Sequence, residues 1–388
     1  MDLSYILNEL GEERVNYFNA IAPPIIQTSN FTFPDVATMR RDMVQEHAVP
    51  FYTRGNNPTV QILCKKLAAL EGAEEALVLA SGSAAIASAV LANVAQGDHI
   101  VSVAKPYSWT LRLMRDLLPR FGVTTTFVDG TDVANFEKAI QPNTKVIYLE
   151  SPNSFTFELQ DIAAVARLAK ARGIVTMIDN SYSTPIYQQP IKVGIDLTLH
   201  SASKYIGGHS DLVAGVICGS EEMIRKIFYS EFMTLGGIIS PMNAWLMLRG
   251  LRTLPLRLAQ SSRSAKMIVE FLEQHPVVRR VYYPFSPSHP QYELAQQQMT
   301  GCGGLLTMAL HTDRMEVVDA FANSLKRFLL GVSWGGHESL VFPASVTYPT
   351  GEAEPGDTNF TLIRLYIGLE ETSALLEDLK QALNRINV

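Results

Sequence analysis

Lys204 has surroundings that suggest covalent chemistry. It stands in the stretch His200-Ser-Ala-Ser-Lys-Tyr-Ile-Gly-Gly-His-Ser210, which follows an apolar run and places a small hydroxyl residue beside the lysine. In a pocket of low polarity a lysine has a lowered pKa, and its amine becomes a nucleophile that can form a Schiff base with an aldehyde. Most lysines are simply solvated, so this interpretation depends on what else the chain supplies.

Two further motifs supply groups that suit such an amine. Ile178-Asp-Asn180 ends an apolar run, where parallel sheets place functional carboxylates; a turn cap is the alternative for Asp179. Ser81-Gly-Ser83 stands at a predicted helix start, where free N–H groups and hydroxyls can bind a phosphate or where Ser81 can simply cap the helix. Neither GxGxxG nor GxxxxGK[ST] occurs there, so the motif predicts no dinucleotide site and no Walker loop.

Together the three motifs match the needs of pyridoxal 5'-phosphate. Lys204 would bind the cofactor aldehyde, Asp179 would keep the pyridine nitrogen protonated so that the ring accepts electrons, and the helix start at Gly82 would hold the phosphate. The sequence therefore predicts an enzyme that uses this cofactor on a small molecule, and it predicts no metal site.

The chain resembles the Cys/Met-metabolism pyridoxal-phosphate enzymes, which include cystathionine lyases and synthases, methionine γ-lyase and homoserine sulfhydrylases. The motifs that carry the resemblance are Tyr52-Thr-Arg54, Asn57-Pro-Thr59, Glu150-Ser-Pro152, Ile178-Asp-Asn180, Ser201-Ala-Ser-Lys-Tyr-Ile-Gly-Gly-His-Ser-Asp211, Arg249-Gly-Leu-Arg-Thr-Leu254 and Ser333-Trp-Gly-Gly-His-Glu-Ser-Leu340. Ser333-Trp-Gly-Gly336 looks like the bacterial cystathionine β-lyase branch. By contrast, Asn57-Pro-Thr59 and Ile206-Gly-Gly208 look like the γ-lyase and γ-synthase branch.

The resemblance implies roles for the residues of the cofactor site. Lys204 would carry the Schiff base and act as general base, and Asp179 would pair with the ring nitrogen. Tyr107 would stack on the ring and assist proton transfer with a lowered pKa. The implied phosphate ligands are Gly82, Ser83, Ser201 and Ser203, with Tyr52 and Arg54 supplied by the neighbouring subunit.

The resemblance also implies a substrate site and an assembly. Arg364, helped by Ser333, would bind the substrate α-carboxylate, because a guanidinium fork fits a carboxylate. Arg364 stands inside the apolar stretch Leu362-Ile-Arg-Leu-Tyr-Ile367, which disfavours an exposed position. Since Tyr52 and Arg54 would serve a neighbour, the resemblance implies a homo-oligomer with shared active sites, a homotetramer built as a dimer of dimers.

One departure from the family pattern falls in the loop after Glu150. This chain reads Glu150-Ser-Pro-Asn-Ser-Phe155 where many members read Glu-Ser-Pro-Thr-Asn-Pro. The contact to the ring hydroxyl that an asparagine usually makes would come from Ser154 or from Asn153.

Other departures bear on the substrate side of the pocket. Tyr107-Ser-Trp-Thr110 replaces Tyr-Gly-Gly-Thr and places the bulky Trp109 near the ring. Val332 replaces a glutamate that precedes the Ser-Leu-Gly-Gly block in many γ-specific enzymes, and Trp334 replaces the leucine of that block.

From these features we expect a carbon–sulfur lyase of sulfur amino acids, with β-elimination of cystathionine to homocysteine, pyruvate and ammonia as the leading reaction. The alternatives on the same fold are γ-elimination and γ-replacement. A relative that has lost catalysis is a third alternative, against which the intact Lys204, Asp179 and Arg364 weigh. A nicotinamide dehydrogenase is disfavoured because GxGxxG is missing.

The elements that must position these residues alternate along the chain. The predicted strands are 76–80, 99–103, 124–128, 145–149, 174–178, 196–199, 277–283, 304–310 and 361–367, and the predicted helices are 61–71, 84–95, 107–121, 161–171 and 243–274. Short apolar strands alternating with helices are typical of a mainly parallel sheet covered on both faces.

The expected fold class is α/β, the fold-type I pyridoxal-phosphate transferase fold. A large, mostly parallel α/β/α domain is expected over 61–242. A linker helix and a smaller C-terminal α+β domain are expected over 243–388. Residues 1–60, with scattered prolines, are expected to form an arm that contacts a neighbouring subunit.

Composition excludes several classes of protein. The 388 residues carry 32 basic and 38 acidic side chains, and a formal net charge of −6 predicts no nucleic-acid partner. Three cysteines without a CxxC motif and an acidic N-terminal stretch favour the reducing cytoplasm. The uncharged residues 76–97 are interrupted by Ser81-Gly-Ser83, so we expect a buried strand and helix there and no membrane span.

Overall fold

The computed structural model describes residues 1–349, 351, 353, 354 and 356–386. The chain divides into two compact units. The first unit consists of Met1–Ser151, Gln160–Gly207 and Asp211–Arg252, and the second of Pro152–Leu159, Gly208–Ser210 and Thr253–Val388. The expected N-terminal arm (1–60), large domain (61–242) and linker helix with small domain (243–388) remain predictions.

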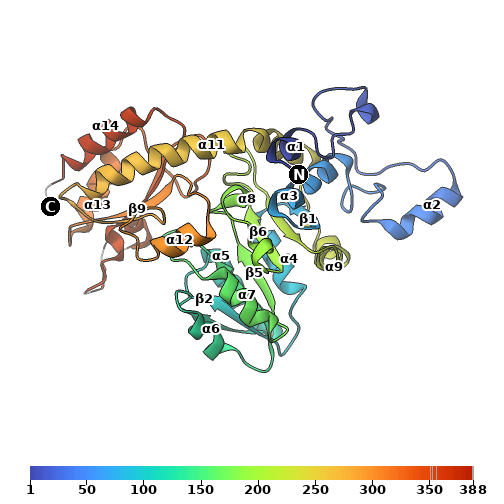
Figure 1. Cartoon of the computed structure of the whole chain (residues 1–388), viewed down its shortest axis with the longest axis horizontal. Coiled ribbons are helices and arrows are strands. Elements are labelled where there is room, and N and C mark those ends of the chain that lie inside the picture. Colours follow the sequence, from blue (N-terminus) through green and yellow to red (C-terminus); the bar gives the residue numbers. More distant parts are fainter. Residues whose placement is uncertain (350, 352, 355, 387–388) are drawn as a thin grey trace. The chain divides into compact units, whose positions relative to one another are not determined.

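A seven-stranded sheet forms the centre of the first unit (Figure 1). Its order is β1-β7-β6-β5-β4-β2-β3, and β7 is the strand that runs antiparallel to its neighbours β1 and β6. The strands are β1 (Glu75–Leu79), β2 (His99–Val103), β3 (Thr124–Val128), β4 (Thr144–Glu150), β5 (Val175–Asp179), β6 (Leu197–Ser201) and β7 (Gly215–Gly219). The mainly parallel sheet confirms the expected fold class. The strand signal of β7 is weak because glycine occupies both of its ends.

Helices cover both faces of this sheet, as expected. Along β4, Tyr148 belongs to one hydrophobic core, and Ile147 and Leu149 belong to another, because successive side chains of a strand point to opposite faces. The helices of the first unit include α3 (Pro58–Glu71), α4 (Gly82–Leu91), α6 (Val133–Ala139), α7 (Ile162–Lys170), α8 (Thr184–Tyr187), α9 (Glu221–Ile227) and α10 (Met233–Leu235). No helix in the described part of the chain is long and apolar enough to cross a membrane.

The segment expected as one helix over 107–121 consists of three short helical pieces. These are α5 (Ser108–Arg112), a π-helical turn (Leu113–Leu117) and a 3-10 turn (Leu118–Phe121). Pro119 has no backbone N–H and cannot continue an α-helical hydrogen-bond pattern. Gly122 then ends the segment with a positive φ of 75°.

The second unit is built on a five-stranded sheet in the order β10-β11-β12-β9-β8. The strands are β8 (Val278–Tyr282), β9 (Leu305–Leu310), β10 (Leu329–Leu330), β11 (Leu340–Pro343) and β12 (Leu362–Tyr366), and the helices are α12 (Tyr292–Gln298), α13 (Met315–Ser324) and α14 (Thr372–Leu383). The long helix α11 (Pro241–Glu273) leads into this unit from the first. The strands β10 and β11 and the helices α12 and α13 are missing from the sequence predictions, whereas β8, β9 and β12 lie within predicted strands.

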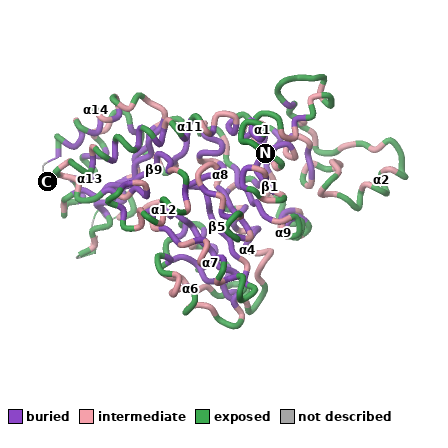
Figure 2. Tube along the Cα trace, viewed as in Figure 1, coloured by how far each residue is buried: buried purple, intermediate pink, exposed green. Residues whose placement is uncertain are grey.

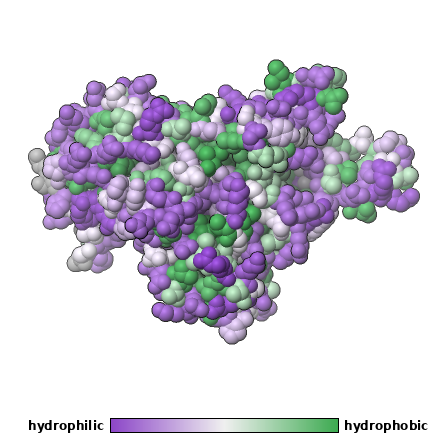
Figure 3. Space-filling model, in the orientation of Figure 1, coloured by the Kyte–Doolittle hydropathy of each residue, from purple (hydrophilic) through white to green (hydrophobic). Residues whose placement is uncertain are grey.

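The N-terminal residues of the first unit carry α1 (Leu3–Asn8) and α2 (Val36–Asp42). Figure 2 shows mostly exposed positions around α2, where the chain extends away from α3. Hydrophobic atoms reach the surface on this segment (Figure 3), and the exposed apolar side chains include those of Val15, Phe18, Ile21, Val36 and Val44.

Candidate active site

Lys204 follows β6 in a tight turn. The backbone N–H of Lys204 donates to the carbonyl of Ser201 at 3.1 Å, and that of Gly207 donates to the carbonyl of Ala202 at 2.8 Å. A Cβ on Gly207 would lie 2.9 Å from the same Ala202 oxygen, so the turn requires glycine there. The buried Tyr205 follows and anchors the turn, while Lys204 itself is half-buried at the carboxyl end of the sheet.

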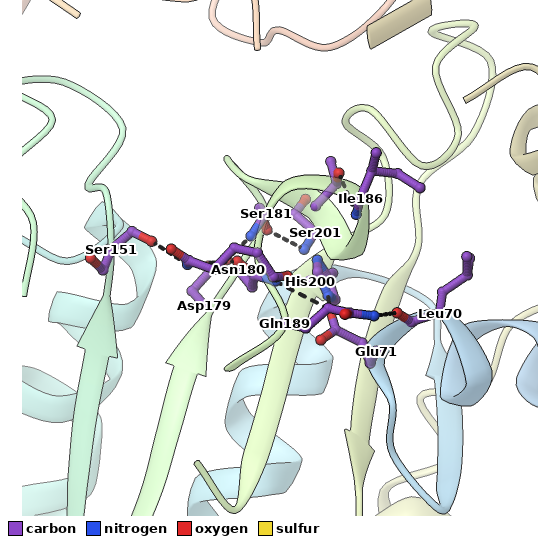
Figure 4. Close-up of polar contacts among 12 residues, drawn as sticks. Leu70, Glu71, Ser151, Asp179, Asn180, Ser181, Ile186, Gln189, His200 and Ser201 are labelled. Carbon is purple, nitrogen blue, oxygen red and sulfur yellow. Dashed lines mark hydrogen bonds and ion pairs between the residues drawn. The ribbon is translucent and has the colours of Figure 1, made fainter. Parts of the chain in front are cut away.

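Asp179 ends the neighbouring strand β5 and is 7% exposed. Its Oδ1 accepts the N–H of Ser181 at 2.9 Å, and Ser181 Oγ accepts the N–H of Ser201 at 2.6 Å (Figure 4). Burial raises the pKa of the Asp179 carboxyl group, whereas hydrogen bonds from Ser181 and the charges of His200 and Lys204 oppose that rise. The fold therefore brings Asp179, Ser201 and Lys204 together at adjacent strand ends.

Helix α4 begins at the predicted phosphate motif. Ser81 is its N-cap, since Ser81 Oγ accepts the N–H of Ala84 at 3.0 Å, so the helix-cap alternative holds for this residue. The N–H groups of Gly82 and Ser83 belong to the first turn and have no partner within the helix. A side chain on Gly82 would place its Cβ 2.9 Å from Ser201 Cβ. Glycine thus allows the helix start to approach the end of β6 closely.

The two serines of the Lys204 turn differ. Ser203 Oγ accepts the N–H of Ala214 at 3.0 Å and donates to the Ala214 carbonyl at 3.4 Å, so this hydroxyl ties the turn to the chain before β7. The Ser201 hydroxyl lies beside Gly82 and has no such bond to Ala214. Of the two, Ser201 is the better placed to join the N–H groups of the α4 start.

Tyr107 precedes α5 and remains 42% exposed. Its N–H donates to Glu150 Oε2 at 2.6 Å, which fixes the backbone of Tyr107 against the end of β4. The lowered pKa that we expect for the phenol depends on cations and a phosphate beside it, so it stays a prediction about the site with its cofactor bound. Burial raises the pKa of Tyr107, the charges of Asp179 and Glu150 add to the rise, and a hydrogen bond with Ser83 opposes it. Tyr107 nevertheless lies among the predicted cofactor residues.

Tyr52 and Arg54 lie in the segment that precedes α3. The guanidinium of Arg54 lies over the Tyr52 ring at 5.3 Å from the ring centre, and neither side chain hydrogen-bonds to Gly82 or Ser201 within the described residues. Trp109 in α5 is 57% exposed, and Arg112 lies over its ring at 5.0 Å. Trp109 therefore shares the helix that follows Tyr107 but presents most of its ring to the surface.

Arg364 on β12 is a charged residue that is buried in the second unit. It is 9% exposed, so it is not an exposed strand charge, and burial lowers its pKa to about 10. Its donors meet backbone carbonyls, with Nη2 at 2.8 Å from Val332 O and Nη1 at 3.5 Å from Ser154 O. No carboxylate of the described residues pairs with it. A buried guanidinium without an anion is suited to bind one.

Aromatic rings hold the Arg364 guanidinium. Its central carbon lies 5.8 Å from the Phe155 ring centre and 5.2 Å from that of Phe342, and the two rings meet edge to face at 6.2 Å. Ser333 follows Val332, whose carbonyl accepts from Arg364, so the predicted pair of Arg364 and Ser333 falls in one neighbourhood. Trp334, the next residue, is 6% exposed and packs inside the unit.

In the loop after Glu150, where the sequence departs from the family pattern, the Asn153 side chain stabilises the loop itself. Asn153 Oδ1 accepts the N–H groups of Phe155, Thr156 and Phe157 at 3.2, 3.0 and 2.9 Å. Phe157 is fully buried with a positive φ of 56°, and these bonds support that unusual backbone. The Asn153 side chain is therefore committed to its own loop, which leaves Ser154 as the candidate for the contact to the ring hydroxyl.

Sequence reasoning missed four polar residues of this region: Ser181, Glu150, Glu71 and His200. Ser181 could have been found, because a residue two positions after a strand-end Asp often donates its N–H to that carboxylate. Glu150 lay inside a quoted motif but received no role. Glu71 and His200, which pair with each other in the core, are too far apart in sequence for any spacing rule to join them.

The groups that the fold gathers in the first unit fit pyridoxal 5'-phosphate. The unpaired N–H groups at the α4 start and the Ser201 hydroxyl suit a phosphate, and the Gly82 approach leaves room that a Cβ would fill. The buried Asp179 suits a protonated ring nitrogen, and the half-buried Lys204 supplies an amine for the aldehyde. Nothing in this donor set conflicts with that cofactor.

Comparisons with known proteins agree with this geometry. L-methionine gamma-lyase of Treponema denticola is 38% identical over 378 residues, 96% of this chain and 94% of that protein. Cystathionine gamma-lyase of Bacillus subtilis is 38% identical over 97% of both chains, and cystathionine beta-lyase MetC of the same organism is 37% identical over 90% of both. The crystal structure of metB from Corynebacterium glutamicum, 34% identical, superposes with a TM-score of 0.91 over 99% of this chain and 98% of that chain. A family model for Cys/Met metabolism PLP-dependent enzymes matches residues 6–384, and the chain belongs to that family of pyridoxal-phosphate enzymes of sulfur amino acid metabolism.

Proposed function

We propose that this protein is a carbon–sulfur lyase that cleaves cystathionine by β-elimination, with water, to homocysteine, pyruvate and ammonia. The observation that carries the choice is Val332, whose carbonyl accepts from Arg364 and whose side chain is 79% exposed. β-Elimination removes a proton from the α-carbon and expels a thiolate from the β-carbon. γ-Elimination must also remove a proton from the β-carbon, and a valine offers no acid or base for that additional transfer.

The residues divide the work as follows. When bound, the cofactor supplies an aldehyde that condenses with amines and a ring that accepts the electron pair left at the α-carbon. Lys204 would hold the aldehyde and then move the α-proton as general base. Asp179 would keep a proton on the ring nitrogen, while Gly82, Ser83 and Ser201 would bind the phosphate.

Arg364 would orient the substrate. Its guanidinium already has a neutral, apolar and carbonyl-lined surrounding, so a substrate carboxylate would supply the missing opposite charge. Ser333 would add a hydroxyl beside that carboxylate. Holding the carboxylate fixes which substituent at the α-carbon faces the base, which is a large part of what such a site must provide.

A homo-oligomer belongs to this proposal. The side chains of Tyr52 and Arg54 make no hydrogen bond to Gly82 or Ser201 of their own chain within the described residues, and we propose that they complete the phosphate site of a neighbour. The exposed apolar side chains of the N-terminal segment, such as Phe18 and Val44, support a subunit contact there. We propose a homotetramer, a dimer of dimers, in the cytoplasm, where the cysteines Cys64, Cys218 and Cys302 would stay reduced, as they are in the structure.

The second candidate is γ-elimination, which the names of two 38%-identical relatives favour. The keto acid released from cystathionine separates the candidates, because β-elimination yields pyruvate and γ-elimination yields 2-oxobutyrate. We expect pyruvate from purified protein and none from Lys204→Ala. A product consisting of 2-oxobutyrate would replace the proposal by the second candidate, and a protein that never takes up a yellow cofactor would refute both.

A further inference from the structure

Glu150 is a buried acidic residue at the carboxyl end of β4, where it is 5% exposed. Its Oε2 accepts the backbone N–H of Tyr107 at 2.6 Å, and its own N–H donates to Oε1 of the buried Gln160 at 3.2 Å. Burying a carboxylate lowers the stability of a protein unless strong hydrogen bonds offset the cost. The bond from Tyr107 is one of the contacts that do so, because its acceptor is charged.

Strand alternation places the Glu150 side chain on the face of the sheet to which Asp179 also points. The two residues are partners in the register of β4 and β5, and partners in parallel strands share a face. Tyr148, two residues earlier on β4, shares a hydrophobic core with Leu113 of the π-helical turn. The chain that continues from Tyr107 therefore packs on the face toward which Glu150 and Asp179 point.

Tyr107 depends on its backbone for its position, because its side chain is 42% exposed and packing holds only part of it. It follows Pro106 at the start of α5, where an N–H has no acceptor within the helix. Glu150 supplies that acceptor, and the Tyr107 carbonyl accepts the N–H of Leu111 at 2.9 Å. The Glu150 bond thus fixes the backbone from which the phenol reaches its hydrogen bond with Ser83.

We propose that Glu150 is a positioning residue of the cofactor site: its carboxylate holds the backbone of Tyr107 so that the phenol ring stacks on the cofactor ring. This rests on the proposed cofactor site and on the place that we expect for Tyr107 in it. Glu150 itself touches neither cofactor nor substrate in this scheme. Its effect passes through Tyr107, so it should vanish where residue 107 has no ring to place.

The test measures the binding of pyridoxal 5'-phosphate to the full chain after removal of bound cofactor. Kd is followed by absorbance, and the circular dichroism of the cofactor band reports how the bound ring is held. Glu150→Met and Glu150→Gln both remove the charge and keep the length of the side chain, but the glutamine retains an oxygen for the Tyr107 N–H. We expect Glu150→Met to raise Kd about fivefold, the loss of one ring contact, and to weaken the dichroism. Glu150→Gln should stay within about twofold of wild type.

Tyr107→Ala tests whether the effect passes through the ring. It should itself raise Kd and weaken the dichroism. Adding Glu150→Met to it should change Kd by less than about twofold, because residues that act through one contact are not additive. Asp196→Ala is the matched control: Asp196 Oδ2 accepts the N–H of Thr176 at 2.7 Å at the amino end of the same sheet, so this variant removes a bond of the same kind and should leave Kd unchanged.

Three results would overturn the proposal. Equal losses in Glu150→Met and Glu150→Gln would assign the effect to the charge, a full loss on top of Tyr107→Ala would assign it to another route, and an unchanged Kd in Glu150→Met would leave no effect to explain. If Glu150→Met does not fold, Glu150→Asp, whose carboxylate is one methylene shorter, is measured in its place and should also raise Kd.

Failure of the underlying site would look different. If Tyr107→Ala alone changes neither Kd nor the dichroism, the expected place of Tyr107 on the ring is wrong, and the role of Glu150 falls with it. None of these measurements uses a substrate, so β-elimination stands or falls separately on the keto acid released from cystathionine.

Discussion

Lys66 in the first unit and Arg364 in the second are cationic side chains that the fold buries, and they differ in what faces them. Lys66 is 1% exposed, and its Nζ lies 3.1 Å from Glu12 Oε1 and donates to the carbonyls of Ile6 and Leu7 at 3.0 and 3.1 Å. Arg252 reaches the same carboxylate at 3.1 Å. Arg364 meets carbonyls and rings but no carboxylate of the described residues.

The difference teaches how to separate structural from functional charge. Glu12 is the carboxylate that Lys66 faces, and Arg252 and Arg14 approach it as well. These ion pairs fasten the N-terminal residues to α3 and to the start of α11. Burying a cation without an anion lowers the stability of the folded protein unless a bound ligand offsets the cost. Arg364 is such a cation, and its burial without a carboxylate of the described residues supports the proposal that it binds the carboxylate of a substrate.

The largest expected effect follows from removing Lys66 from its ion pair with Glu12. Lys66→Ala leaves the carbonyls of Ile6 and Leu7 without their donor and opens a cavity, so we expect the free energy of unfolding to fall by about 3–5 kcal/mol. Urea denaturation of wild type and variant measures this. Lys66→Met, which keeps the volume, should recover part of the loss. KM for the amino acid should stay at the wild-type value in any variant that remains folded, and a higher KM would contradict the structural role.

Removing Arg364, which faces no carboxylate of the described residues, should affect substrate binding and leave stability intact. Arg364→Ala deletes the proposed carboxylate partner, so we expect KM to rise about 100-fold, equivalent to about 2.7 kcal/mol. The free energy of unfolding should not fall, because the variant no longer buries an unpaired charge. Steady-state kinetics and urea denaturation on the same preparation measure both quantities. Arg364→Lys keeps a point charge and should restore only part of the affinity. An unchanged KM for Arg364→Ala would refute the clamp.

A third buried base tests the comparison at acidic pH. His289 is 6% exposed, and burial with the charge of Arg280 lowers its pKa to about 4, while its Nδ1 accepts the N–H of Gln291 at 3.2 Å. The unfolded chain takes up this proton near the ordinary pKa of 6.5, so stability is lost as pH falls from about 6.5 to about 4. We expect a loss of about 2 kcal/mol from this group.

Denaturation at several pH values measures that loss. The matched variant is His289→Asn, whose side-chain oxygen can accept from Gln291 but does not titrate in this range. The variant should lose about 2 kcal/mol less than wild type between pH 6.5 and 4. Parallel curves for the two proteins would show that His289 does not bury a neutral imidazole.

The sequence allowed much of this arrangement to be predicted, and the failures have physical reasons. Strand-end motifs placed Lys204 and Asp179 correctly at one edge of the sheet, because period and apolar runs determine where parallel strands end. The sequence prediction of one continuous helix over 107–121 was wrong, although Pro119 is a residue that typically interrupts an α-helix. The partners Glu71 and His200 could not be predicted, since their contact depends on how α3 packs against β6 and not on spacing along the chain.

The smallest expected effect is a rise in KM when an aromatic ring beside Arg364 is removed. The ring of Phe155 replaces a proline of the family pattern and stands 5.8 Å from the guanidinium. A cation over a ring gains about 1 kcal/mol, so Phe155→Leu should raise KM about fivefold with little change in kcat. Phe342→Leu, which removes the ring at 5.2 Å, is the matched comparison and should act in the same direction. If the rings orient the fork, either variant should also weaken the preference for a planar carboxylate over a neutral amide analogue of the substrate. Equal weakening for carboxylate and amide would mean that the rings only fill space, and Arg364 would then be held by the carbonyls of Val332 and Ser154 alone.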